Sequence, residues 1–132
     1  MKKILCSTGA LIGMPNNRDF SLIKKCVPNI NSDGFEFMMY STWYDKVPNL
    51  LKELKKCETE FPVMHCEKHI GEDLGKNADG NFYTAKEKFK VNCKIANEIG
   101  AKRMVMHLWD GIYSDTTIEN RFIHRKCSLQ SP

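Results

Sequence analysis

Four short apolar runs constrain this fold more than any other feature of the sequence. They occupy residues 3–7, 35–39, 61–66 and 102–109, and each is followed by a polar loop and a stretch of helical periodicity. Such runs are typical of buried parallel strands, whose two faces both meet apolar neighbours. A strand and a helix recur every 30 to 40 residues or so, roughly the spacing of parallel βαβ units. The sequence therefore predicts an α/β fold with about four parallel βα units.

The first two helices are predicted from capping residues and apolar stripes. Asn17 is expected to cap the first helix, with Asp19 in its first turn and an apolar stripe that includes Ile23. Asp45 is expected to open the second helix, with Pro48 in the first turn, where proline is tolerated.

The second half of the chain contains a loop, a long helix and a polar end. A long glycine-containing loop is expected over 67–83, and Thr84–Glu87 fits a capping box that would start a helix ending at Gly100. Another helix is expected to start within 115–122. Residues 121–132 lose the apolar periodicity and contain no fifth strand, so they are predicted to form an irregular or disordered tail.

Composition places the chain among ordinary globular proteins. Hydrophobic residues make up 42% and charged residues 27%, and the net charge is +4. The lysines alternate with acidic residues on helix-like segments, so a nucleic-acid surface is not expected, whereas an anionic small molecule would suit the charge. The sequence shows no membrane span and no secretory signal, which favours a cytoplasmic protein. Reduced thiols are accordingly expected at the six cysteines, Cys6, Cys26, Cys57, Cys66, Cys93 and Cys127.

Two histidines occupy equivalent places in the pattern. His65 closes the run Val63-Met64-His65, and His107 closes the run Val105-Met106-His107. The carboxyl ends of parallel strands are where ligands bind in strand–helix–strand folds. A neutral imidazole there can bind a metal, donate to a substrate oxygen or move a proton. The repeated placement therefore favours a site over two structural histidines.

Three further residues are candidates for contact with a ligand. Glu36 lies between Phe35 and Phe37, where a carboxylate needs a partner or a wet cavity. It either faces the ligand site or forms a buried ion pair with a lysine. Glu67 follows His65 in the loop, and Trp109 follows His107, where it forms either a wall of the site or part of the core.

The segment His65-Cys66-Glu67-Lys68-His69 is not expected to be a zinc-protease motif. That motif needs His-Glu-x-x-His on one helix, whereas here the glutamate is displaced by one position and the segment leaves a strand. Glu67, Lys68 and His69 remain candidate loop contacts.

Several of these segments together resemble a known group of enzymes. They are Asp33–Phe37, Phe61–Gly71, the helix through Asn92 and Ala96 to Ala101, and Val105–Gly111 with Ser114-Asp115. They resemble the first half of the sugar phosphate isomerase/epimerase group, whose members share the xylose isomerase-like TIM barrel with endonuclease IV. The resemblance implies that residues 1–120 are the amino-terminal half of a (β/α)8 barrel.

The resemblance also implies a function and a cofactor. Isomerases of this group hold a divalent metal such as Zn, Mn or Mg at the carboxyl ends of the strands and move a proton between adjacent carbons of a sugar or sugar phosphate. The metal candidates are His65 and His107, by their match to zinc ligands of the endonuclease IV branch, whereas in the isomerase branch the same positions more often contact substrate. The substrate-contact candidates are Glu36, His65, Glu67, His107 and Trp109. Most of the group's ligands and both proton-transfer groups come from strands five to eight, so this chain is expected to be truncated and inactive alone, with its catalytic residues unknown.

Two alternatives remain at this point. In the endonuclease IV branch, histidines at the third and fourth strand ends are zinc ligands, which would make the protein an enzyme that repairs abasic DNA. His107-Leu108-Trp109 stands where that branch usually has His-Pro-Gly, which favours the sugar branch. The other alternative is a non-catalytic half-barrel that self-associates as a homo-oligomer through open sheet edges.

Overall fold

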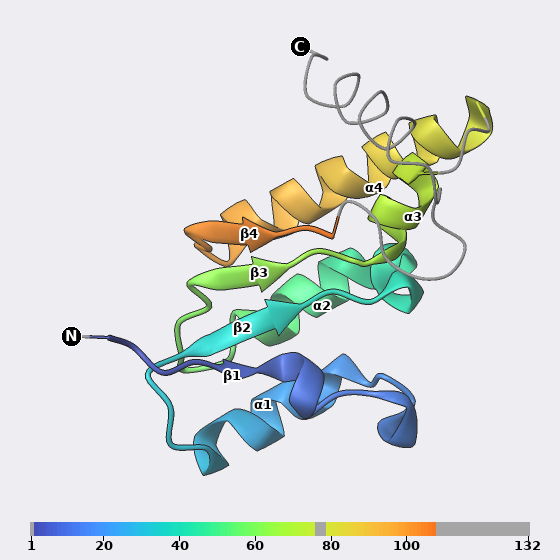
Figure 1. Cartoon of the computed structure of the whole chain (residues 1–132). Coiled ribbons are helices and arrows are strands. Elements are labelled where there is room, and N and C mark those ends of the chain that lie inside the picture. Colours follow the sequence, from blue (N-terminus) through green and yellow to red (C-terminus); the bar gives the residue numbers. More distant parts are fainter. Residues whose placement is uncertain (1, 76–78, 108–132) are drawn as a thin grey trace.

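The chain forms a layer of helices against a four-stranded parallel sheet. A computed structural model describes residues 2–75 and 79–107 (Figure 1). The strands lie in the order β1-β2-β3-β4, and every neighbouring pair is parallel. Their bounds are β1 Cys6–Ser7, β2 Phe35–Met38, β3 Val63–His65 and β4 Arg103–Val105. All four strands begin within the predicted apolar runs and are shorter than those runs.

Helical segments connect these strands. The α-helices are α1 Ile23–Cys26, α2 Val47–Leu54, α3 His69–Gly75 and α4 Asp79–Glu98. Short 3-10 turns are η1 Thr8–Ala10, η2 Met14–Asn16, η3 Phe20–Leu22, η4 Val27–Asn29 and η5 Ser41–Lys46. The predicted alternation of parallel strands and helices is thus confirmed as an α/β arrangement.

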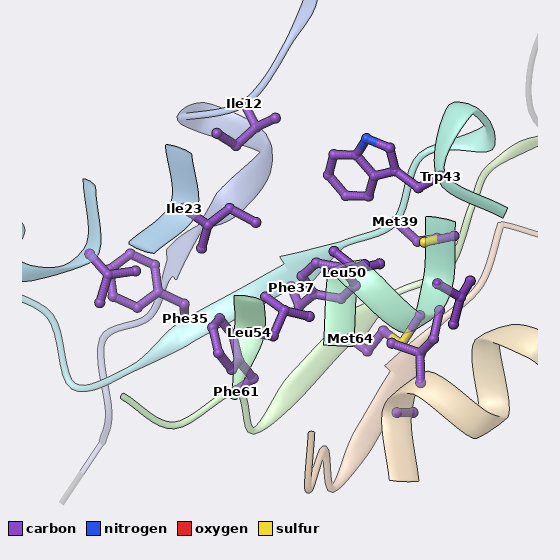
Figure 2. Packing of buried hydrophobic residues seen from close by; sticks show 14 residues of the cluster. Ile12, Ile23, Phe35, Phe37, Met39, Trp43, Leu50, Leu54, Phe61 and Met64 are labelled. Carbon is purple, nitrogen blue, oxygen red and sulfur yellow. The ribbon is translucent and has the colours of Figure 1, made fainter. Parts of the chain in front are cut away.

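The sheet has two chemically different faces. Phe35, Phe37 and Met64 are buried on the face that meets the helices, where they pack with residues such as Leu50 of α2 and Ile95 of α4 (Figure 2). Side chains alternate between the two faces of a strand. The intervening positions Glu36, Met38 and His65 are only partly buried, so they lie on the opposite face.

The register lines up residues of this opposite face in rows across the sheet. One row runs Ser7, Glu36, Val63 and Arg103, and the next row toward the carboxyl ends runs Met38, His65 and Val105. Glu36 and Met38 thus share this face, and Phe35 and Phe37 lie on the other. Within the described ranges, every α-helix that enters the main core packs on the other face.

The starts of the first two helices differ from prediction. Asn17 does not cap the amino terminus of a helix. It has a left-handed backbone with φ 54° and ends η2. Asp19 provides the cap, since its side chain accepts a hydrogen bond from the Ser21 amide, and only one turn of α-helix follows, at α1. Asp45 falls inside η5, and α2 starts two residues later with Pro48 in its first turn. Several residues that can cap a helix lie close together in these segments, and the local sequence does not determine which of them starts the helix.

The predicted loop over 67–83 is largely helical. α3 runs His69–Gly75, and α4 already begins at Asp79, so Thr84 is not the amino-terminal cap of that helix. Ile70 of α3 is fully buried against Cys66 and Ala85, and this small second core stabilises a helix that lacks strong propensity. Gly100, with φ 73°, ends the α4 segment as predicted.

Some expectations fall on residues that the structure does not describe. Four of these expectations lie outside the described ranges, namely the helix within 115–122, the tail 121–132, the thiol of Cys127 and the candidate ligand contact Trp109. Among the described helices, none combines the length and the apolar character that crossing a bilayer requires.

Candidate functional site

A cavity of about 370 Å³ opens at the carboxyl ends of β2 and β3. This is the end of the sheet at which the sequence predicted a site. The loops after these strands, the η2–η3 connection and the start of α3 contribute its wall. The lining residues are Arg18, Met38, Met39, Tyr40, Ser41, His65, Cys66, Glu67, Lys68, His69 and His107.

The two predicted histidines meet in this cavity. Their Nε2 atoms lie 3.0 Å apart, and the ring centroids lie 4.8 Å apart. His107 follows Val105, the register partner of His65, by two residues, and therefore lies on the same face of the sheet. Sequence reasoning thus predicted the juxtaposition correctly.

The hydrogen bonds of His65 indicate the tautomer of its ring. Its Nδ1 lies 3.2 Å from the carbonyl oxygen of Cys66. Because a carbonyl only accepts, Nδ1 carries the proton. In a neutral ring Nε2 is then unprotonated and carries a lone pair. The Nε2–H of His107 can donate to that lone pair. Histidine can also bind a metal through an unprotonated Nε2 of this kind.

The histidine pair fits two neighbouring positions around a metal ion. With metal–nitrogen bonds of about 2.1 Å, two ligands lie about 3.0 Å apart at the right angle of an octahedral ion and about 3.4 Å apart at the tetrahedral angle of zinc. The observed Nε2 separation of 3.0 Å matches the octahedral angle, and it is also the length of the hydrogen bond between the two rings. Across residues 2–75 and 79–107, no group of three or more His, Cys, Asp or Glu side chains is arranged to share one ion. The described part of the chain therefore brings together two imidazoles that could ligate an ion, and not a whole coordination sphere.

Glu67 holds His69 at the edge of the same cavity. Its carboxylate is buried and accepts hydrogen bonds from the His69 backbone amide, at 2.9 Å, and from Nδ1 of the His69 ring. A carboxylate at Nδ1 fixes the tautomer and the orientation of the ring. Glu72 Oε2 lies 3.9 Å from that Nε2 atom. His69 begins α3 whereas His65 ends β3, so the two histidines do not share a helix as a zinc-protease motif would require.

A buried polar network supports this carboxylate from behind. The side-chain oxygen of Asn92 accepts from the Glu67 amide at 3.2 Å, and its amide nitrogen donates to the Tyr44 hydroxyl at 2.9 Å and to the Lys88 carbonyl at 2.7 Å. The Tyr44 hydroxyl in turn lies 3.5 Å from Glu67 Oε2. Sequence reasoning used Asn92 only as part of a resemblance and missed Tyr44.

Burial keeps neighbouring groups neutral. Desolvation raises the pKa of the Tyr44 phenol well above its usual value, with the nearby Glu67 charge adding to the shift. Desolvation likewise raises the pKa of the Cys66 thiol to about 12, with Cys93 and Glu67 contributing. Tyr44 therefore acts as a neutral donor toward Glu67, and Cys66 is a packed thiol and not a nucleophile.

Arg18 is the most informative lining residue that sequence reasoning missed. Its backbone is left-handed, with φ 51°, and its guanidinium carbon lies 5.1 Å from the centroid of the Tyr40 ring. It sits in a loop without periodicity, and its position depends on tertiary contacts. No local pattern in the sequence distinguishes it from other arginines.

Glu36 lies one row below this cavity. Its Oε1 accepts a hydrogen bond from Ser7 Oγ at 3.3 Å, across the register pair that joins β1 and β2. Glu36 is thus on the predicted face without lining the cavity. In the described part of the chain, the hydrogen-bond partner of this carboxylate is a hydroxyl and not a lysine.

Comparison of the chain with protein-family models, with curated proteins and with solved structures finds no match.

Proposed function

We propose that this chain carries the amino-terminal part of the active site of a sugar or sugar phosphate isomerase or epimerase, built on a xylose isomerase-like (β/α)8 barrel. The observation that carries the proposal is the pair of Nε2 atoms, 3.0 Å apart, at the carboxyl ends of β3 and β4. A divalent ion held there would supply Lewis-acid stabilisation of a sugar oxygen.

The order of the strands supports a barrel over the other common parallel architecture. In a barrel, consecutive strands lie side by side and the helices form a single outer layer. A doubly wound sheet reverses its strand order and has helices on both faces. Here the order is consecutive, and the core helices share one face of the sheet. The helix-free face would then be part of the barrel interior.

The chain's own residues have separable tasks in this proposal. His65 and His107 would hold the ion and would orient the sugar oxygens beside it. His69, oriented by Glu67, can hold a proton at the rim of the cavity. Neutral Tyr44 and Asn92 keep that carboxylate in place. We assign the protein to the cytoplasm, in keeping with the five described cysteines, which are all free thiols.

The size of the cavity favours a sugar over DNA. About 370 Å³ is within the range for small-molecule sites. Endonuclease action would need a long cationic surface along a duplex, whereas the net charge here is only +4. Binding of abasic duplex DNA that weakens steeply with salt would favour the repair enzyme instead.

Metal binding tests the proposal directly. Co²⁺ or Zn²⁺ is titrated into the full chain and followed by calorimetry and, for Co²⁺, by visible absorption. We expect His65→Ala and His107→Ala each to weaken binding about tenfold or more, because each removes one imidazole ligand.

His69→Ala is the matched control. Within residues 2–75 and 79–107 no third ligand joins the histidine pair, so His69 is not part of the proposed metal site and this variant should keep metal affinity within a few-fold of the wild type. Absence of metal binding, or equal binding by the His65→Ala/His107→Ala double variant, would overturn the proposal of a metal site.

A further inference from the structure

Arg18 is held in a backbone conformation that an arginine rarely adopts. Its φ of 51° follows Asn17 at 54°, so two consecutive residues without a glycine are left-handed. Tertiary contacts fix this conformation at both ends. The Arg18 amide donates to the Gly13 carbonyl at 2.9 Å, and the Arg18 carbonyl accepts from the indole of Trp43 at 2.7 Å. Strain of this kind tends to persist where a side chain must be aimed for function.

The Arg18 guanidinium lies on an aromatic ring and, among residues 2–75 and 79–107, forms no ion pair with a carboxylate. It rests on the Tyr40 ring at 5.1 Å, a cation–π contact that fixes its plane, and the Tyr40 hydroxyl is anchored to the Ile12 carbonyl at 2.6 Å. Its Nε atom is buried and donates no hydrogen bond within residues 2–75 and 79–107. A buried donor left without an acceptor is costly, and this one belongs to a side chain that lines the cavity.

The charges around the cavity favour an anionic ligand. The buried carboxylate of Glu67 is occupied by His69, while Lys68 adds a second cationic side chain to the lining. A guanidinium offers planar paired donors that match the oxygens of a phosphate or a carboxylate. Such an oxyanion would accept hydrogen bonds from the terminal Nη groups of Arg18 and compensate the arginine charge.

We infer that Arg18 is the oxyanion-recognising residue of this site, so that the ligand is an anionic sugar derivative, with phosphate as the group that it binds. This inference rests on the proposed function, because it concerns the same cavity, and it deepens that function by selecting phosphorylated over neutral sugars. The histidine pair and Arg18 then contact different parts of one ligand.

The test compares ligands that differ only in the charged group. Inorganic phosphate, ribulose phosphate, unphosphorylated ribulose and gluconate are titrated into the full chain and followed by calorimetry and NMR. We expect ribulose phosphate to bind at least about tenfold more tightly than ribulose, and Arg18→Gln to remove this preference. Arg18→Lys should recover only part of it, because lysine keeps the charge and loses the paired donors.

Two further variants keep the inference falsifiable. Arg18→Gly accommodates φ 51° without a side chain, so it separates loss of the guanidinium from loss of the loop conformation. Lys25→Gln lowers the net charge equally at an exposed position of α1 and should leave the phosphate preference unchanged.

Each outcome decides the inference. An equal affinity for ribulose and its phosphate, or a preference that survives Arg18→Gln, overturns it. Binding of gluconate but not of either phosphate retains an oxyanion site and overturns phosphate as its ligand. Failure of the metal titration with a phosphate preference intact would reject the metal-dependent isomerase and leave the role of Arg18 standing.

Discussion

Asn92 is a fully buried amide that joins three parts of the site. From α4 it contacts the Glu67 backbone, the Tyr44 hydroxyl and the Lys88 carbonyl. An amide is suited to this place because it accepts with one atom and donates with the other. A hydrophobic residue of similar size would leave two buried polar groups without their present hydrogen bonds. Asn92 therefore stabilises the core and the site at once.

Replacing Asn92 by alanine should lower the free energy of unfolding by about 2–3 kcal/mol, since the Glu67 amide loses its acceptor and the Tyr44 hydroxyl loses a donor. Urea denaturation followed by circular dichroism measures the change. Asn97→Ala, at an exposed position of the same helix, is the matched control and should change stability by less than about 0.5 kcal/mol. Equal effects of the two substitutions would show that the buried network contributes little.

Arg18 shows where residue-level prediction from sequence ends. The two histidines could be predicted because each closes an apolar strand run, a pattern that fixes both its face and its end of the sheet. The position of Arg18 depends on the Trp43 indole and the Gly13 carbonyl, which are brought to it by the fold. Contacts of this kind have no counterpart in local periodicity.

At the scale of elements, the turn before β2 sets the register of the sheet. The Asp33 carboxylate accepts from the Ile4 amide at 2.8 Å, and the Gly34 carbonyl accepts from the Cys6 amide at 3.2 Å. Gly34 has φ +148°, and a Cβ atom there would meet the Glu60 carbonyl oxygen at 3.0 Å. Glycine is thus required both by the backbone conformation and by the close approach of a neighbouring chain segment.

Gly34→Ala should therefore destabilise the protein by about 1–3 kcal/mol, because the new methyl group meets backbone that cannot move cheaply. Thermal and urea unfolding measure this loss. Gly13→Ala serves as the comparison, since Gly13 has φ −161° and its added Cβ would lie 3.7 Å from Pro15 Cδ. A stability loss at Gly13 as large as that at Gly34 would contradict this account of the turn.

The strands β2 and β3 could be predicted from the sequence and the helix α3 could not, for a physical reason. Parallel strands buried between neighbours need continuous apolar runs, so β2 and β3 could be located from the apolar runs of the sequence. α3 could not, because its sequence, His69-Ile70-Gly71-Glu72-Asp73-Leu74-Gly75, contains two glycines and resembles a loop. Burial of Ile70 against Cys66 and Ala85 outweighs that weak propensity.

Across the whole molecule, stability is expected to follow the order of the sheet. β2 and β3 each have a paired strand on both sides, whereas β1 is paired on one side among the described residues. The Met39 amide, bonded to the His65 carbonyl, and the Cys66 amide, bonded to the Val105 carbonyl, both belong to buried residues. The Cys6 amide, bonded to the Gly34 carbonyl, belongs to a partly buried residue of β1.

Native-state hydrogen exchange should therefore be at least about tenfold slower at Met39 and Cys66 than at Cys6, because opening an outer strand disturbs less packing than opening the centre of the sheet. Two-dimensional NMR after transfer to deuterated buffer measures all three amides in one experiment. Equal protection at the three amides would indicate that the sheet opens only as a unit.

The separation of the two sheet faces has a consequence for how this protein could change over generations. Helix-facing residues such as Phe37 and Met64 are locked into a shared core, whereas Glu36, His65 and Val105 stand on the other side of the same strands. Mutations at the second set alter the chemistry offered to a ligand and leave the first set intact. Natural or directed evolution could therefore change the substrate through positions such as Glu36, His65 and Val105 while the core of the fold stays the same.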